Sequence, residues 1–287
     1  MTFREAETIR QALTAAAAQL AAHPQLRDNA ARDAELLLFH SLQLPRTTLF
    51  TNPTLPLTSD QAAIYNHCIA RRLTLEPIQY ITGTQEFYGL ALKVTPAVLI
   101  PRPETELLVE ATLAHLPTNQ PLRILDIGTG SGAIAIAIAH NLPHAHLTAV
   151  DISPAALHIA QQNAITHNVD HRITFLHSDL LASVTHPTFD AILSNPPYIP
   201  TSDLSTLHPQ VRDHEPHSAL FAGPTGLDLY AQIIPQAHAA LTPGGLLALE
   251  IGHAQSGPIR HLLAEWYDIL VLDDLQQIPR VVLAHRP

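Results

Sequence analysis

Three glycines at alternate positions, Gly128, Gly130 and Gly132, directly follow the apolar run 123–127. Glycine lets the backbone turn sharply and approach a ligand closely, because no Cβ atom is in the way. An apolar run, this turn and the Ala-rich stretch 133–140 together predict one strand–turn–helix unit. Such a unit restricts the surrounding fold to sheets whose parallel strands are connected by helices.

The chain beyond this unit repeats the alternation of strands and helices. We expect strands at 147–150, 173–176, 189–193, 246–251 and 281–284, and helices at 154–166 and 227–241. This order predicts an α/β fold with a doubly wound, Rossmann-like sheet. Ligands of such sheets bind outside the carboxyl ends of the strands, at the switch point. The glycine turn, Asp151 and the tetrapeptide 195–198 each follow a strand, so we expect them to converge on one edge.

The first 75 residues are predicted to be helical. Helices are expected over 8–22, from an Asp28 cap to Leu42, and over 58–73, where Ile64 and Cys68 share the apolar positions. This pattern predicts a small bundle, with Cys68 in its core rather than acting as a nucleophile.

A hairpin is predicted where the helical pattern stops. Tyr80-Ile81 and 90–94 flank Gly83 and Gly89, as two short strands would. The expected organisation is a helical domain over 1–75, a β-hairpin linker over 76–96, and a catalytic domain over 97–287.

Composition excludes several classes of protein. With 15 Lys and Arg against 25 Asp and Glu, the net charge of −10 argues against a general nucleic-acid binder. A single cysteine excludes an internal disulfide and a multi-cysteine zinc site. The densest histidines, His140, His144 and His146, have no carboxylate among them, so we expect no metal. Residues 1–11 lack the apolar core of a signal peptide, and no apolar stretch approaches about 20 residues, which predicts a cytoplasmic protein without a membrane span.

The glycine turn alone does not identify its ligand. With Ala133 it also fits the dinucleotide pattern G-x-G-x-x-A, and Asp151 follows at the distance expected for a ribose contact. Asp126 stands just before the turn, where a carboxylate would repel a pyrophosphate but suit a cationic ligand. S-adenosylmethionine carries a sulfonium and an ammonium and no phosphate, so the turn favours it over a dinucleotide. A tight turn without any ligand is the alternative.

Two further strand ends offer contacts for a nucleoside. Asp151 could accept both ribose hydroxyls, although an ordinary polar strand end is possible. Asp179 could accept from the adenine amine while Leu180 packs against the ring; the alternative for Asp179 is a helix cap.

The tetrapeptide Asn195-Pro196-Pro197-Tyr198 is the strongest chemical signal in the chain. Prolines donate no backbone hydrogen bonds, which leaves the Asn195 side-chain oxygen and the Pro196 carbonyl as acceptors, and Tyr198 adds an aromatic face. This set suits a planar NH₂ group, because acceptors on both hydrogens help localise the nitrogen lone pair and stabilise positive charge developing on nitrogen. A rigid surface turn is the alternative.

The whole sequence resembles the HemK-type peptide-chain-release-factor glutamine N5-methyltransferases, which are class I methyltransferases. The resemblance rests on the helical N-terminal region and on the segments 85–89, 100–106, 125–132, 194–199, 215–220 and 249–252. Two departures stand out: 274–280 lacks the glycine usual in that loop, and His214 stands where an aromatic residue is common.

The resemblance implies transfer of a methyl group from S-adenosylmethionine to the glutamine side-chain nitrogen of a Gly-Gly-Gln motif in class I release factors, leaving S-adenosylhomocysteine. It implies a catalytic role for Asn195, Pro196 and Tyr198, and substrate binding by Asn195 to Tyr198, Pro197 included. The cofactor residues expected from the resemblance and the strand ends are Gly128, Thr129, Gly130, Ser131, Gly132, Asp151, Asp179, Leu180 and Asn195. Arg102 and Glu104 are expected to shape the cleft or to form a structural ion pair.

Three other functions remain open at this point. An adenine-N6 nucleic-acid methyltransferase would use the same acceptors, a nicotinamide oxidoreductase would leave Asn195 unexplained, and a binding module would not turn over. We expect a monomer whose partner is a protein, not nucleic acid or a membrane. The helical domain would recognise that protein, with Arg71-Arg72 and 85–89 as contacts, or would only cover a sheet edge.

Overall fold

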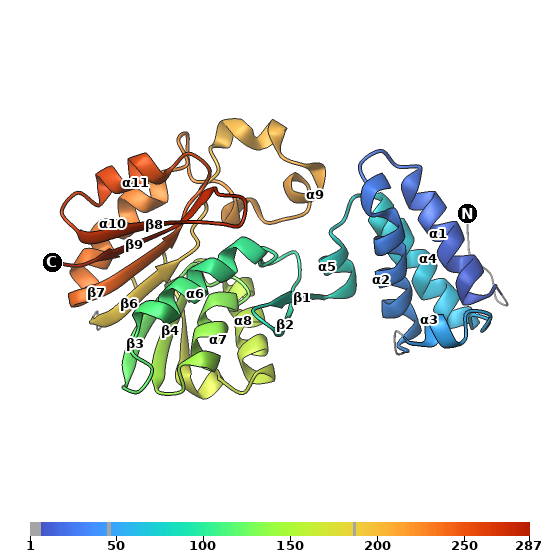
Figure 1. Cartoon of the computed structure of the whole chain (residues 1–287), viewed down its shortest axis with the longest axis horizontal. Helices are drawn as coiled ribbons and strands as arrows, with labels where there is room; N and C mark the ends of the chain where they lie inside the picture. Colours follow the sequence, from blue (N-terminus) through green and yellow to red (C-terminus); the bar gives the residue numbers. More distant parts are fainter. Residues whose placement is uncertain (1–6, 45–46, 186–187) are drawn as a thin grey trace. The chain divides into compact units, whose positions relative to one another are not determined.

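The computed structural model describes the whole chain except residues 1–6, 45–46 and 186–187 (Figure 1). The chain forms two compact units. The helical unit comprises Met1–Gly83 together with His208–His214, and the catalytic unit comprises Thr84–Leu207 together with Glu215–Pro287. The division falls at residue 83, so the expected linker over 76–96 is not a separate part: its first residues are helical and its hairpin belongs to the catalytic unit.

The helical unit is a bundle of short helices. They are α1 (Ile9–Ala21), η1 (Arg27–Asn29), α2 (Ala30–Leu42), α3 (Thr47–Thr51), α4 (Ser59–Leu73) and α5 (Ile78–Thr82). Thr8 and Thr58 begin α1 and α4 with capping boxes. Each threonine hydroxyl accepts from the backbone N–H of the glutamine three residues later, and the side chain of that glutamine accepts from the threonine backbone N–H. Cys68 is 3% exposed and lies among the core side chains of α1, α2 and α4, which confirms its predicted place.

Three local predictions in this unit are wrong. Asp28 lies inside the turn η1 and does not cap α2, whose N-cap is Asn29. Tyr80 and Ile81 form a turn of helix rather than a strand, because Pro77 sets a helix-compatible φ at its start and Gly83 ends it with φ +78°. Ile64 is 46% exposed rather than part of the core.

A buried ion pair joins α2 to α4. Arg72 Nε lies 2.7 Å from Asp33 Oδ2, and both side chains are 7% exposed. The same guanidinium donates from Nη1 to the Glu76 carbonyl and to Gln210 Oε1, both at 2.9 Å. Arg72 is therefore fully engaged inside the unit, and the expectation that it contacts a partner protein is wrong.

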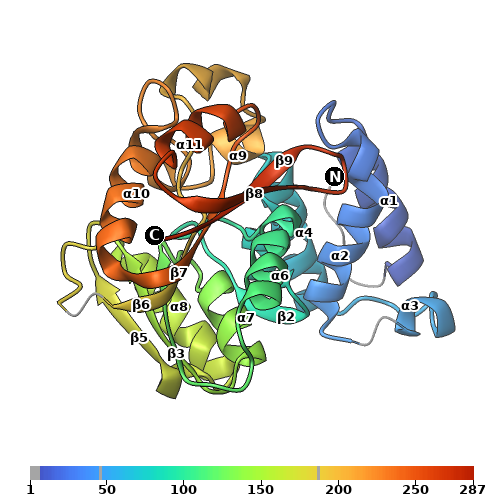
Figure 2. The same ribbon diagram turned by 60° about the vertical axis from the view of Figure 1, so that its left-hand side comes forward.

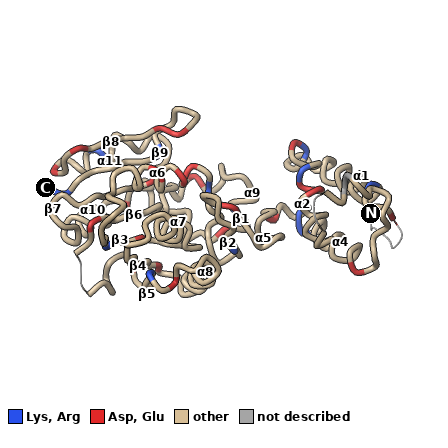
Figure 3. The backbone as a smooth tube through the Cα atoms, turned by 60° about the horizontal axis from the view of Figure 1, so that its bottom comes forward, with Lys and Arg blue, Asp and Glu red and all other residues tan. Residues whose placement is uncertain are grey.

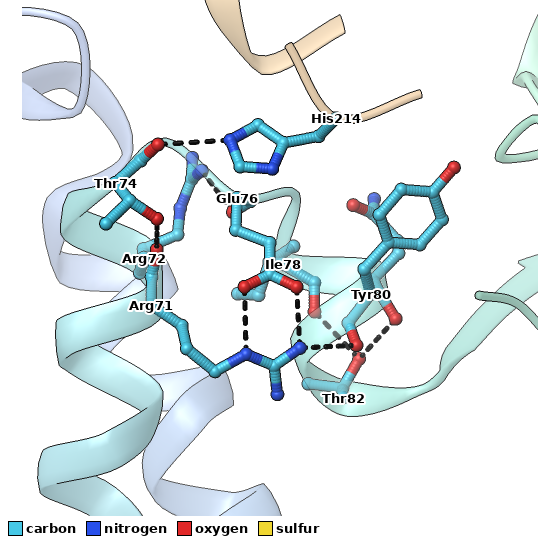
Figure 4. Close-up of polar contacts among 9 residues, drawn as sticks. Arg71, Arg72, Thr74, Glu76, Ile78, Tyr80, Thr82 and His214 are labelled. Atoms are coloured by element: carbon cyan, nitrogen blue, oxygen red, sulfur yellow. Dashed lines mark hydrogen bonds and ion pairs between the residues drawn. The ribbon is translucent and has the colours of Figure 1, made fainter. Parts of the chain in front are cut away.

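The segment 208–214 is held to this unit by polar contacts at the end of α4 (Figure 4). His214 stands where an aromatic residue is common, and it forms a hydrogen bond there. Its Nε2 donates to the Thr74 carbonyl at 3.1 Å. Arg71 pairs with Glu76 at 2.6 Å and donates to the Tyr80 carbonyl at 3.2 Å.

The catalytic unit contains a seven-stranded sheet of order β5-β4-β3-β6-β7-β9-β8 (Figures 1 and 2). Its strands are β3 (Leu122–Ile127), β4 (Ala145–Asp151), β5 (Ile173–His177), β6 (Phe189–Ser194), β7 (Leu241–Glu250), β8 (Tyr267–Asp273) and β9 (Pro279–His285). The first five in spatial order run parallel, and β9 runs antiparallel to both its neighbours. After β3 the chain adds β4 and β5 on one side of that strand, and β6 and β7 then follow on the other side. This order confirms the doubly wound sheet, with a switch point between β3 and β6.

Helices cover both faces of this sheet (Figure 1). They are η2 (Pro103–Thr105), α6 (Glu106–His115), α7 (Ala133–Asn141), α8 (Pro154–Thr166), η3 (Asp170–Arg172), η4 (Thr201–Thr206), η5 (His217–Ala219), α10 (Asp228–Ala240) and α11 (Ser256–Leu262); α9 (Pro209–Arg212) lies in the segment of the helical unit. One buried cluster packs α6 and α7 on the sheet, and a second packs α10 and α11 on the opposite face. The hairpin β1 (Thr84–Phe87) and β2 (Leu90–Lys93) contributes Phe87 and Leu92 to the first cluster.

Candidate active site

A pocket of about 370 Å³ lies at the carboxyl ends of the central strands. This volume falls within the range of about 300–1,000 Å³ found for small-molecule sites. Eight of the predicted residues line it: Gly128, Gly130, Asp151, Asp179, Leu180, Asn195, Pro196 and Pro197. The strand ends therefore converge as predicted, because consecutive parallel strands bring their loops to one edge.

The glycine turn divides into pocket residues and packing residues. Gly128 and Gly130 line the pocket, while Thr129, Ser131 and Gly132 are not among its lining residues. All three glycines have positive φ, between +55° and +83°, where other residues are strained. A Cβ at Gly132 would lie 2.9 Å from the Ile136 Cδ1 atom. The position of Gly132 thus serves the approach of α7 rather than the pocket.

Asp126 supports the turn from below. Its carboxyl is fully buried, accepts from the Thr129 hydroxyl at 2.7 Å, and does not line the pocket. Burial raises the pKa of Asp126 to about 7, against the lowering effect of that hydrogen bond. Its carboxylate is therefore placed to hold the turn, not to face a cationic ligand directly.

Asp151 ends β4 and lines the pocket. Its Oδ2 accepts from the Gly130 backbone N–H and its Oδ1 from that of Ser153, both at 2.8 Å. Each carboxylate oxygen can accept a second hydrogen bond, so two acceptor positions remain for two hydroxyls. Burial raises the pKa of this carboxyl, and the backbone donors counteract the rise.

Three further residues, Ile152, Asp179 and Leu180, line the pocket. Asp179 is exposed, and in the described part of the chain no helix begins there, so the alternative of a helix cap does not hold. Leu180 lies at φ +46°, a strained conformation for leucine that places it at the pocket wall. Ile152 is 58% exposed and lines the same wall, and sequence reasoning missed it. The feature of the sequence that could have indicated Ile152 is its position as an apolar residue directly after Asp151, at the end of a strand.

Asn195 follows β6 and lines the pocket. Its Nδ2 donates to the Thr105 hydroxyl at 3.1 Å, which leaves Oδ1 as the free end of the side chain. The preceding Ser194 hydroxyl donates to the Ile127 carbonyl at 2.8 Å and fixes the strand end. Pro196 and Pro197 line the pocket next to Asn195.

Tyr198, the last residue of the tetrapeptide, is not among the residues that line the pocket. Its carbonyl accepts from Gln255 Nε2 at 3.0 Å, and a Cβ at Gly252 would lie 2.9 Å from its ring. Burial raises the pKa of its hydroxyl, which donates to Glu250 Oε1 at 3.4 Å.

The segment 100–106 connects the tetrapeptide to other loops of the unit. Arg102 pairs with the buried Glu215 at 2.5 Å, so the structural ion pair exists, but its partner is not Glu104. Glu106 accepts from the Tyr88 backbone N–H at 2.9 Å and so fixes the turn of the hairpin. Other wall segments that sequence reasoning missed are 97–99, 216–223 and 228–233, which contribute Val98, Phe221 and Leu229.

Two features are absent from the residues that the structure describes. Among them, no group of three His, Cys, Asp or Glu side chains is arranged to hold a metal ion. Within the same residues, no helix has both the length and the apolar character that crossing a membrane requires.

Comparisons with known proteins agree with this architecture. Residues 104–209 match the methyltransferase small domain family, and residues 11–83 match the PrmC N-terminal domain family. Among solved structures, the Thermus thermophilus 16S rRNA N2 G1207 methyltransferase in complex with AdoMet and guanosine matches with a TM-score of 0.54 at 21% identity. The match covers 71% of this chain and spans half of that chain, and it shows a shared fold.

Relatives with much higher identity share nearly the whole chain. The release factor glutamine methyltransferase of Koribacter versatilis (strain Ellin345) is 47% identical over 255 residues, covering 88% of this chain and 90% of the relative. That of Moorella thermoacetica is 45% identical over 282 residues, covering 97% and 99%. With this identity over both units, the chain belongs to the family of release factor glutamine methyltransferases.

Proposed function

We propose that this enzyme transfers the methyl group of S-adenosylmethionine to the side-chain amide nitrogen (N5) of the glutamine in the Gly-Gly-Gln motif of class I peptide chain release factors. The observation that carries the proposal is the orientation of Asn195, whose Nδ2 is bound to Thr105 and whose Oδ1 is free beside the pocket. Relatives that carry this function in their names match the chain over both units.

The pocket residues fit S-adenosylmethionine. Asp151 retains two acceptor positions for the ribose hydroxyls, and Ile152 and Leu180 offer apolar surface to the adenine ring. Gly128 and Gly130 present bare backbone where the methionine part would pass. When bound, S-adenosylmethionine supplies an electrophilic methyl group on a positively charged sulfur.

The catalytic residues act on the glutamine amide, which is a poor nucleophile because its lone pair is delocalised. Asn195 Oδ1 and the Pro196 carbonyl accept the two amide hydrogens and help localise the lone pair on nitrogen. As the nitrogen forms its bond to the methyl carbon and the carbon–sulfur bond breaks, these acceptors stabilise the positive charge on nitrogen. The nitrogen then releases one proton to water, which leaves a neutral methylated amide. Tyr198 fixes the end of the tetrapeptide through its hydrogen bonds with Gln255 and Glu250.

The test of this function is methyl transfer to a purified class I release factor. We expect one labelled glutamine per molecule, and no label when that glutamine is replaced by Ala. Equal labelling of the replaced protein would overturn the proposal. Duplex and single-stranded nucleic acid at low salt are the competing substrates, and labelling of either would support adenine methylation instead. Figure 3 shows Lys and Arg as isolated segments along the tube of the catalytic unit, which favours a protein substrate.

Calorimetry tests the cofactor separately. We expect S-adenosylhomocysteine to bind and NAD not to bind, because the buried Asp126 carboxyl group lies beneath the glycine turn that would hold a pyrophosphate. Binding of NAD alone would overturn the assignment. Retained S-adenosylhomocysteine binding without turnover on any substrate would instead indicate a binding module.

We further propose that the helical unit recognises the protein substrate. In this proposal the enzyme is a monomer and acts in the cytoplasm. A single amide offers too little surface for specificity, so a second contact region is required. Ile64 on α4 is an apolar side chain exposed on this unit, and nothing in the catalytic mechanism uses it. Arg71 is part-buried in its pair with Glu76, so we assign the contact with the substrate protein to the exposed face of α4 that carries Ile64.

Two variants test this recognition role. A chain that starts at Thr84 should still bind S-adenosylhomocysteine but show a steeply raised KM for the release factor. Ile64→Asp in the full chain should raise KM while kcat stays unchanged, with Ile165→Asp, at another exposed isoleucine, on α8 of the catalytic unit, as the control. An unchanged KM in both variants would contradict a docking role.

A further inference from the structure

Glu250, at the end of β7, is a buried carboxyl group that the mechanism above does not use. The residue is 1% exposed, and its Oε2 has no hydrogen-bond partner among the described residues. Its Oε1 accepts from the Tyr198 hydroxyl at 3.4 Å, and the Thr105 hydroxyl also bonds to this carboxyl group. Glu250 thus lies directly behind the residues that face the substrate amide.

Thr105 links Glu250 to Asn195. A threonine hydroxyl has one hydrogen to donate and lone pairs with which to accept. Because an ionised carboxylate only accepts, the Thr105 hydrogen goes to Glu250 while that group is ionised, and only lone pairs then face Asn195. The Asn195 amide must then present its NH₂ group to Thr105, as the 3.1 Å contact from Nδ2 has it.

We propose that Glu250, acting through Thr105, is a positioning residue that selects the orientation of the Asn195 amide with Oδ1 toward the substrate. This inference rests on the proposed function, since it explains why Asn195 offers an acceptor rather than a donor to the glutamine NH₂. An amide turned by 180° would place its own NH₂ against the substrate NH₂ and lose the acceptor.

The surroundings of Glu250 contain few charges. Arg280, which pairs with Asp274 at 3.2 Å, stabilises its ionised form, while Glu104 opposes it. Burial raises the pKa of Glu250 to about 7, and the hydrogen bond from Thr105 is the largest influence that lowers it. No ion pair replaces the Thr105 contact among the described residues, so the carboxyl depends on hydroxyl donors.

The decisive comparison uses three variants, two of Thr105 and one of Glu250. Thr105→Val removes the hydroxyl at nearly constant volume and should lower kcat about 100-fold, the loss that a misplaced reacting geometry causes, with KM unchanged. Thr105→Ser keeps the hydroxyl and should recover most of that loss. Glu250→Gln can donate to Thr105, which turns the Thr105 hydrogen toward Asn195, so kcat should fall as for Thr105→Val. Thr112→Val is the matched control, because Thr112 is fully buried on α6 and donates only to the Leu108 carbonyl.

The Asn195→Ala background separates positioning from general stability. If Thr105 acts through Asn195, Thr105→Val should reduce kcat no further in that background. An undiminished effect of Thr105→Val on the Asn195→Ala enzyme would overturn the inference. So would equal rates for Thr105→Val and Thr105→Ser.

A second measurement needs no substrate. In the ¹⁵N–¹H spectrum of the protein, the Asn195 side-chain amide signals, identified by their loss in Asn195→Ala, should shift upfield in Thr105→Val and stay in place in Thr112→Val. Unshifted signals in Thr105→Val would overturn the inference. If the wild-type chain fails to methylate a release factor, the proposed function falls, and these signals still decide the orientation of Asn195.

Discussion

Asp33 of the helical unit and two carboxyl groups of the catalytic unit, Asp126 and Glu250, are buried in opposite ways, whereas the buried Glu215 of the catalytic unit is paired with Arg102. In the helical unit, Asp33 meets the Arg72 guanidinium at 2.7 Å, in a pair whose side chains are both 7% exposed. In the catalytic unit, Asp126 and Glu250 are 0% and 1% exposed and have hydroxyl groups as partners; neither forms an ion pair among the described residues. Burial raises the pKa of both to about 7.

This difference separates groups that hold the fold from groups that hold the site. A buried ion pair fixes two helices in one arrangement, but it contributes stability only while both partners are present. A buried carboxyl without a cation costs stability, and natural sequences keep such groups where a side chain must be oriented. Asp126 holds the glycine turn through Thr129, and Glu250 lies behind the tetrapeptide.

The largest expected effect comes from breaking the paired site. Arg72→Met should lower the free energy of unfolding of the helical unit by about 3–5 kcal/mol, because Asp33 is left buried without its cation. The double variant Asp33→Leu with Arg72→Met should recover most of this loss. Urea unfolding followed by circular dichroism measures both. Equal stability of the single and double variants would show that the ion pair has no such role.

The next effect concerns the acceptor in the catalytic unit. Asn195→Ala should lower kcat by about 10²–10³-fold, as the loss of one preorganised polar group at a reacting centre does. Affinity for S-adenosylhomocysteine should fall much less, since Asp151 and the glycine turn remain. A collapse of that affinity with an unchanged single-turnover rate at saturation would make Asn195 a cofactor ligand only.

Apart from these substitutions, the stability of the catalytic unit should depend on pH. The pKa values of Asp126 and Glu250 are about 7 in the folded chain, against ordinary values of 3.8 and 4.5. Between about pH 4.5 and 7 the folded state therefore binds protons that the unfolded state has lost. The free energy of unfolding of the catalytic unit should fall as pH rises through this window, by about 1.4 kcal/mol per pH unit and group.

Two variants check this slope against the ion pair. Asp126→Asn should reduce the slope by about half, because asparagine does not titrate while Glu250 still does. The double variant Asp33→Leu with Arg72→Met should leave the slope unchanged. The measurement is urea unfolding at several pH values, and an unaltered slope in Asp126→Asn would contradict the assignment.

Features that are contiguous in the sequence could be predicted, and contacts between distant residues could not. The glycine turn and Asn195 to Tyr198 carry their geometry in adjacent residues, so their convergence followed from the parallel sheet alone. The Thr105–Asn195 bond joins residues 90 positions apart, and no local pattern indicates it. Glu215 gave no sign that it would be the partner of Arg102, because both lie in loops whose paths depend on the folded unit.

Local ambiguity explains the remaining errors. Two adjacent apolar residues, Tyr80 and Ile81, fit a strand and a single helical turn equally well, and burial inside the helical unit decides between them. Arg72 beside Arg71 resembled an exposed basic pair, whereas the helical period turns one inward to Asp33 and leaves the other near Glu76. Ile152 was missed because an exposed isoleucine becomes meaningful only when the folded chain shows that it lines the pocket.

The most direct test of this division of roles is kcat for glutamine methylation at saturating substrates, measured side by side in Glu250→Gln and in the double variant Asp33→Leu with Arg72→Met. The account predicts a large loss of kcat in Glu250→Gln and a wild-type kcat in the double variant. A wild-type kcat in Glu250→Gln, or an equal loss in both, would contradict it.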